Sequence, residues 1–190
     1  METVNDDIQK ACDVLKRGGI ILYPTDTIWG IGCDATNDEA IERVFALKQR
    51  ADTKAMIVLI DSPDKLPLYV SDVPEIAWKQ MELTVKPLTI IYPEGKNLAR
   101  RLLGEDRSIG IRITNESFSK QLCKAFRKPI VSTSANISGQ PSPAFFNEIA
   151  AEIKNGVDYI VQFRRDEQQI STPSSIIRLE NDNTFQLIRK

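Results

Sequence analysis

The sequence predicts an α/β fold in which one twisted, mixed β-sheet is flanked by helices. Segments with helical periodicity alternate with short apolar runs for most of the chain, as in α/β proteins. Further apolar runs follow one another near the end, so the sheet should be mixed rather than purely parallel. A chain of 190 residues can bury a core and still hold a cleft, and we expect one domain over residues 1–190.

The helices are expected where apolar residues recur three and four positions apart. The first begins behind the acidic pair Asp6 and Asp7 and ends before Gly18 and Gly19. In a later helix Phe118, Leu122 and Phe126 share one face, which would pack against the sheet. The helices after the first are expected at residues 37–48, 75–83, 117–126 and 146–154.

The strands are expected at short apolar runs bounded by turn residues. The first run ends at Pro24, which cannot donate a backbone hydrogen bond to a sheet. Another short strand contains Ile130 and Val131 and leads into a polar loop. The full set of longer runs lies at residues 20–23, 56–60, 88–92, 109–114, 159–163, 175–179 and 185–189.

The composition excludes several classes of protein. Hydrophobic residues make up 42% and charged residues 27%, as in ordinary globular proteins, and the net charge of −1 does not favour a protein that coats nucleic acid. No apolar run is long enough to span a membrane, and no signal peptide is present, so we expect a cytoplasmic protein without a membrane partner. Three scattered cysteines suit a reducing compartment, and the absence of histidine excludes histidine-dependent catalysis and histidine metal sites.

The most informative segment is the loop after Val131. Ser132, Ser134 and Asn136 alternate in sequence, so along an extended chain they would face the same side. Small neutral donors and acceptors at the end of a strand are typical of a ligand site in an α/β protein. The alternative is an ordinary surface turn, because Ser, Asn, Gly and Pro also favour turns for local reasons.

Two cationic features break the local rules. Lys48 continues the apolar line of the helix at 37–48, and Arg50 and Lys54 follow it, which indicates an anion site. The alternative is favourable placement of cations at a helix C-terminus. Arg112 lies in the middle of a predicted strand, so it either faces solvent or presents its planar fork to a carboxylate or phosphate.

The segment at residues 23–33 ends a strand in Thr-Asp-Thr and continues to Gly-Ile-Gly. It lacks the third glycine of a dinucleotide-binding fingerprint, and the chain has no P-loop sequence. Any phosphate binding must therefore depend on cations, hydroxyl groups and loop amides.

Three motifs in this order, at residues 18–32, 47–50 and 132–139, closely resemble those of the YrdC-like family, and the resemblance covers essentially the whole chain. It implies a twisted α/β fold with a large central cationic cavity. It also implies a nucleotidyltransferase activity, L-threonylcarbamoyladenylate synthesis, in which L-threonine, bicarbonate or CO2 and ATP give threonylcarbamoyl-AMP and pyrophosphate. Further implications are Mg²⁺ with the ATP, and partner proteins that transfer the threonylcarbamoyl group to tRNA.

The resemblance also implies roles for individual residues. Lys48 and Arg50 would be the catalytic cations, and Arg112 would hold the carboxylate of threonine. Threonine would be bound by Thr27, Arg112 and Ser174. The ATP-binding residues would be Lys48, Arg50, Lys54, Ser108, Ser132, Ser134, Asn136, Ser142 and Arg189. No protein ligand for a metal is implied.

The chain departs from the family pattern at Leu59, where some members carry a substrate-side histidine. One alternative function is a YrdC-like paralogue that binds RNA or nucleotide without synthase activity. Another is a module that binds double-stranded RNA, which the slightly negative net charge does not favour. The oligomeric state and direct contact with tRNA are not predicted by the sequence.

Overall fold

This computed structural model describes residues 3–49, 56–168, 171–180 and 183–190. Its helices are α1 (Val4–Lys16), α2 (Asp38–Leu47), α3 (Leu66–Tyr69), α4 (Glu75–Leu83), α5 (Ser117–Phe126) and α6 (Ala151–Asn155). Its strands are β1 (Ile21–Tyr23), β2 (Gly30–Gly32), β3 (Ile57–Ile60), β4 (Leu88–Tyr92), β5 (Ile109–Ile113), β6 (Ile130–Ser134), β7 (Tyr159–Ile160), β8 (Ser175–Leu179) and β9 (Phe185–Arg189).

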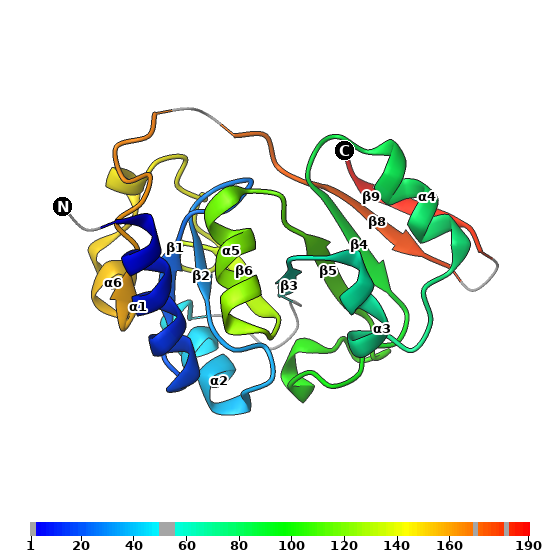
Figure 1. The fold of residues 1–190 in the computed structure, drawn as a ribbon, viewed down its shortest axis with the longest axis horizontal. Helices are drawn as coiled ribbons and strands as arrows, with labels where there is room; N and C mark the ends of the chain where they lie inside the picture. The colour runs from blue at the N-terminus through cyan, green and yellow to red at the C-terminus, as the bar shows by residue number, and fades with distance from the viewer. Residues whose placement is uncertain (1–2, 50–55, 169–170, 181–182) are drawn as a thin grey trace.

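Within the described residues the strands form one mixed sheet in the order β7-β1-β2-β6-β3-β5-β4-β8-β9. The pairs β1–β7, β3–β5 and β4–β8 are parallel, and the other neighbours are antiparallel. The α/β fold with a mixed sheet is therefore confirmed. Because β7 lies at one edge of the sheet and β8 next to the other edge, these two consecutive strands lie at opposite ends of the sheet (Figure 1).

Helices α1 and α5 lie side by side in front of the β1, β2 and β6 region in Figure 1. Helix α1 begins at a capping box, in which the Thr3 hydroxyl accepts from the amide of Asp6 and the Asp6 carboxylate accepts from the amide of Thr3. Helix α5 has Glu116 as its N-cap, and the Glu116 carboxylate accepts from the amides of Phe118 and Ser119. These local caps fix where the two helices start against the sheet.

The expected strand at residues 159–163 is shorter than predicted. After Ile160 the amides of Gln162 and Phe163 donate to the carboxylate of Asp7, at 2.9 and 2.8 Å, rather than to a neighbouring strand. The hydroxyl of Tyr159 donates to the same carboxylate, at 2.7 Å. The buried carboxylate of Asp7 on α1 therefore ends β7, and no local sequence pattern predicts that contact.

Two other expectations are corrected. The helix expected at 146–154 is divided, because Ile149 and Ala150 have extended backbone between a 3-10 turn at Phe146–Glu148 and α6. Strand β2 was not expected, since its glycines have low strand propensity. A Cβ on Gly32 would lie 2.6 Å from Cε1 of Tyr23, so the close packing of β1 against β2 requires glycine there.

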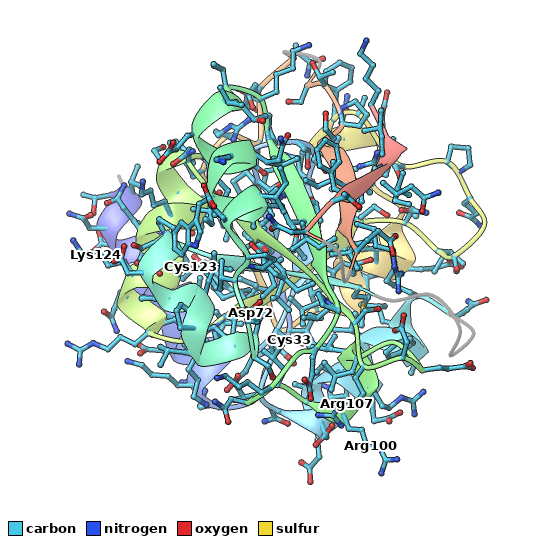
Figure 2. The ribbon with its side chains drawn as sticks, turned by 90° about the vertical axis from the view of Figure 1, so that its right-hand side faces the viewer. Cys33, Asp72, Arg100, Arg107, Cys123 and Lys124 are labelled. Atoms are coloured by element: carbon cyan, nitrogen blue, oxygen red, sulfur yellow. The ribbon has the colours of Figure 1, made fainter. Side chains whose placement is uncertain are left out.

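The core is made mainly of aliphatic side chains from both halves of the sheet, together with aromatic side chains such as Tyr23, Tyr92 and Phe118. The free cysteines Cys33 and Cys123 lie inside it, whereas Lys124 and Arg100 point outward (Figure 2). Burial raises the pKa of both thiols, so they remain protonated at neutral pH. None of the described helices is long and apolar enough to cross a membrane.

Candidate functional site

A cavity of about 430 Å³ lies on one face of the sheet. Its floor comes from side chains that the strand register places next to one another. Arg112 on β5 pairs in register with Thr89 on β4, Thr89 pairs with Ile176 on β8, and Ile176 pairs with Arg189 on β9. Because paired residues project to the same face, these four side chains form one row across the cavity floor.

The neutral wall of the cavity comes from β6 and the loop after it. Ser132 and Ser134 line the cavity, as does Ser142 further along the loop. Asn136 does not, because the strand ends at Ser134 and the chain turns. The Asn136 amide instead donates to the carbonyls of Ile137 and Gln140, so this side chain shapes the loop.

Lys48 is 1% exposed and lies just beyond α2, at its C-cap. Its ammonium group donates to the carbonyl of Ser134 and, at 2.7 Å, to that of Asn136. The inward placement expected from the apolar line is therefore present. In this structure the cation supports the backbone of the hydroxyl-bearing loop rather than lining the cavity.

Arg112 is 3% exposed and directs its guanidinium into the cavity floor. Its Nη1 lies 3.3 Å from Oδ1 of Asp26 and 3.4 Å from Oγ1 of Thr27. Burial lowers the pKa of Arg112, and Asp26 opposes that shift, so the guanidinium stays charged. Its Nε has no hydrogen-bond partner within the described part of the chain, which leaves donor capacity for a ligand.

At the other end of the row, Arg189 is held by Ser174. The Arg189 guanidinium donates to the carbonyl of Ser174 at 3.0 Å and to its hydroxyl at 3.1 Å. The hydroxyl of Ser174 also lies 3.1 Å from that of Thr89. These contacts fix the orientation of Ser174 and Arg189 in the cavity wall.

The structure therefore brings seven of the sequence-predicted site residues to one cavity: Thr27, Arg112, Ser132, Ser134, Ser142, Ser174 and Arg189. Lys48 and Asn136 support it from behind. Ser108 is buried in the turn before β5, where its amide donates to Asp106, and does not line the cavity. Arg50 and Lys54 lie outside the described residues.

Sequence analysis missed several residues of the site, among them the hydroxyl-bearing Thr25 and Thr133. Thr89 and Trp29 line the cavity, and Asp26 pairs with Arg112 behind it. The mid-strand position of Thr89 gave no signal, since threonine is an ordinary strand residue. Asp26 could have been noticed as the acid between two threonines at a strand end, but its partner is known only from the fold.

The charged side chains that line the cavity are all of one sign. Among the described lining residues Arg112 and Arg189 are cations, and none is a carboxylate. No group of three or more acidic, histidine or cysteine side chains that could hold a metal occurs in the described ranges. The cavity is therefore suited to an anionic ligand that also offers partners to several hydroxyl groups.

The fold and the site therefore define a class of protein: a small α/β protein whose sheet carries a cavity lined by hydroxyl groups and arginines. The family model described as "Telomere recombination", which covers the Sua5, YciO and YrdC proteins, matches residues 13–190. The chain belongs to this family, as its motifs suggested. A protein of Pseudoalteromonas translucida (strain TAC 125) named threonylcarbamoyl-AMP synthase is 36% identical over 81% of this chain and 84% of its own length.

Solved structures show the same fold. Sua5 of P. abyssi in complex with L-threonine is 27% identical, with a TM-score of 0.83 over 90% of this chain. The chain spans 50% of the length of that protein. YciO of E. coli is 27% identical, with a TM-score of 0.82 over 96% of this chain and 88% of its own.

Proposed function

We propose that this chain is an L-threonylcarbamoyladenylate synthase, a nucleotidyltransferase that makes threonylcarbamoyl-AMP and pyrophosphate from L-threonine, bicarbonate or CO2, and ATP. The observation that carries the proposal is the buried Arg112, directed into a hydroxyl-lined cavity with a donor left unpaired. The name of the P. translucida relative supports the reaction, and the threonine complex of P. abyssi Sua5 supports the amino acid.

The reaction needs no protein nucleophile. The amine of threonine attacks CO2, a bond forms between nitrogen and carbon, and the nitrogen loses a proton to give a carbamate. A carbamate oxygen then attacks the α-phosphorus of ATP in line, and the bond from that phosphorus to the β-phosphate oxygen breaks to release pyrophosphate. Such chemistry depends on positioning and charge stabilisation, which suits a chain without histidine.

Each wall of the cavity has a part in this scheme. Arg112 binds the carboxylate of threonine, and Thr27 and Ser174 orient the amino acid beside it. Ser132, Ser134 and Ser142 donate to the nucleotide from the opposite wall, with Arg189 adding a positive charge. Lys48 keeps the hydroxyl-bearing loop in place through its backbone carbonyls. Arg50, Lys54 and Ser108 remain predicted ATP-binding residues.

A magnesium ion would enter as part of the substrate. The described lining residues include hydroxyl groups but no carboxylate, which is the side chain Mg²⁺ prefers. The phosphate oxygens and water would therefore supply most of its ligands. Its chemistry there is to offset negative charge on the phosphates.

The product is an activated carbamoyl donor, so it requires an acceptor. We include in the proposal that tRNA threonylcarbamoyl-transferase proteins consume the adenylate to modify tRNA. A synthase can release its product to them, and the proposal needs no direct contact between this chain and tRNA.

The test is incubation with ATP, bicarbonate and labelled L-threonine, followed by chromatographic detection of labelled adenylate and released pyrophosphate. Product should depend on all three substrates. Absence of product from folded protein would overturn the proposal and favour the non-synthase paralogue. Calorimetric titration of threonine separates those two functions further, because only the synthase requires a threonine site.

A further inference from the structure

Asp26 and Arg112 lie between two cavities on opposite faces of the sheet. Arg112 lines the cavity described above, whereas Asp26 lines a second one of about 470 Å³. Side chains alternate along β4 and β5, so the neighbours of Thr89 and Arg112 face the other way. The second cavity is lined by Trp78 on α4 and by Leu88, Ile90, Tyr92, Ile111 and Ile113.

The ion pair between Asp26 and Arg112 leaves polar atoms without hydrogen-bond partners. The Nη1–Oδ1 distance is 3.3 Å, and the two side chains are 4% and 11% exposed. Neither Oδ1 of Asp26 nor Nε of Arg112 has a hydrogen-bond partner within the described ranges. A buried ion pair needs good geometry and further hydrogen bonds to offset the loss of solvation. In this pair the charged atoms are 3.3 Å apart, and the further side-chain hydrogen bond of Arg112 Nη1, to the Thr27 hydroxyl, is long at 3.4 Å. Asp26 is therefore a weakly held counter-ion.

The other charged groups near Asp26 are engaged with one another or lie on the wall of the second cavity. Glu116, the N-cap of α5, pairs at 3.3 Å with Arg164 between β7 and β8, and Arg164 also pairs with Glu167. Glu82 and Lys86 line the second cavity together with Asp26. The nearby hydroxyl of Tyr23 on β1 and thiol of Cys123 on α5 are neutral, since burial raises the pKa of each. Asp26 thus depends on Arg112 for its compensating charge.

A substrate carboxylate on Arg112 changes that balance. Two carboxylates would then share one buried guanidinium, so the carboxylate of Asp26 loses part of its compensating charge in a site of low polarity. Arg189 also acts on Arg112, but it is exposed, so solvent screens its contribution. The buried charge is most simply neutralised by a proton. Burial already raises the pKa of Asp26, with Arg112 opposing the shift, and sharing Arg112 weakens that opposition.

We propose that Asp26 is a positioning residue that holds Arg112 ready in the free protein and takes up one proton from solvent when a substrate carboxylate pairs with Arg112. An O–H bond forms on Asp26, and no other bond changes. Asp26 opens onto the second cavity, so this proton reaches it without crossing the substrate. The inference rests on the proposed threonine site and adds a proton to its binding equilibrium.

The test is calorimetric titration of L-threonine at pH 7 in two buffers of different ionisation enthalpy, with the wild-type chain, Asp26→Asn and Glu116→Gln. The wild type should take up about one proton more than Asp26→Asn. Glu116→Gln removes the neighbouring carboxylate and should behave as the wild type. Equal proton counts in wild type and Asp26→Asn, or loss of uptake in Glu116→Gln alone, would overturn the proposal.

A second measurement tests the inference on the wild type alone, in case the Asp26→Asn variant does not fold. L-threoninol has the amine and hydroxyl of threonine but no carboxylate, so the wild type should take up about one proton fewer with it. Threonine affinity should accordingly fall by up to about tenfold per pH unit relative to threoninol as the pH rises. Threonine binding with equal proton counts for both ligands overturns this inference alone. Failure of the wild type to bind threonine, with no adenylate formed, overturns the proposed function.

Discussion

Arg112 and Arg189 reach the same cavity, yet their surroundings give them different tasks. Arg112 is 3% exposed and is held by groups behind the cavity, whereas Arg189 is exposed and held by Ser174. A buried guanidinium with unpaired donors gives strong and directional binding of a carboxylate. In the proposed reaction, the exposed Arg189 would supply screened positive charge to the polyphosphate.

The first prediction compares these two arginines. Arg112→Lys replaces the planar fork by a single ammonium group, so the KM for threonine should rise about tenfold or more while the KM for ATP stays near its wild-type value. Arg189→Lys is the matched control and should affect ATP instead. Steady-state kinetics with each substrate varied in turn measures both. An unchanged KM for threonine in Arg112→Lys would contradict the carboxylate role.

The second prediction concerns Lys48. Lys48→Met keeps much of the side-chain volume but leaves the carbonyls of Ser134 and Asn136 without this donor. We expect loss of adenylate synthesis together with a decrease in stability of about 1–3 kcal/mol, because buried carbonyls lose a charged donor. Activity assays and urea unfolding measure the two effects. Full stability with lost activity would instead indicate that the ammonium group contacts only the substrate.

At the scale of elements, one exposed ion pair connects three segments at the edge of the sheet. Asp158, just before β7, accepts from the amide of Ile20 at 2.7 Å and from Arg43 on α2 at 2.8 Å. Arg43 also donates to the carbonyl of Gly18 in the turn after α1. Burial tends to raise the pKa of Asp158, but the hydrogen bonds from Arg43 and Ile20 outweigh it, so this pKa lies below its ordinary value.

The third prediction follows from that shift. A carboxyl group with a lowered folded-state pKa stabilises the fold above its unfolded-state pKa, and the effect is lost as the pH falls through the folded-state value. Asp158→Asn should therefore cost about 0.2–1 kcal/mol at pH 7, since the pair is exposed, and the cost should shrink below about pH 4. Urea unfolding at both pH values measures it. Asp72→Asn, the same substitution at another exposed aspartate, serves as the matched control.

The elements with local signals were predictable, and those fixed by distant contacts were not. Helix α2 lies at Asp38–Leu47, within the expected range. Its apolar residues recur at helical spacing, and Asn37 is its N-cap, so both signals are local in the sequence. Strand β7 is shorter than expected because Asp7, far away in sequence, binds its final amides. Likewise Ser132 and Ser134 line the cavity, but so does Thr133 between them, and Asn136 follows a turn, so alternation along β6 accounts for only part of this wall.

At the scale of the whole molecule, the two tryptophans of the chain occupy different cavities. Trp29 lines the proposed active site and packs against Phe146, with ring centroids 4.8 Å apart. Trp78 lines the second cavity on the opposite face. Each indole therefore reports on one face of the sheet.

The fourth prediction uses this separation. ATP or threonine should change the fluorescence of the wild type and of Trp78→Phe, because an indole responds to a ligand that replaces the water beside it. Trp29→Phe should lose the response while keeping the fold. Emission titrations measure it, with circular dichroism as the control for folding. A response that survives in Trp29→Phe and is lost in Trp78→Phe would move the binding site to the other cavity.

The lining of this cavity joins segments that lie far apart in the chain, from Thr25 and Thr27 beside β1 to Arg189 on β9. A partly unfolded chain in which either edge of the sheet has come away would therefore lack a wall of the site and bind substrate poorly. Substrate should then protect the complete fold against local opening as well as global unfolding. At a concentration one hundred times Kd, the gain is about 2.7 kcal/mol. A cell rich in ATP would thus lengthen the lifetime of this protein merely by keeping it occupied.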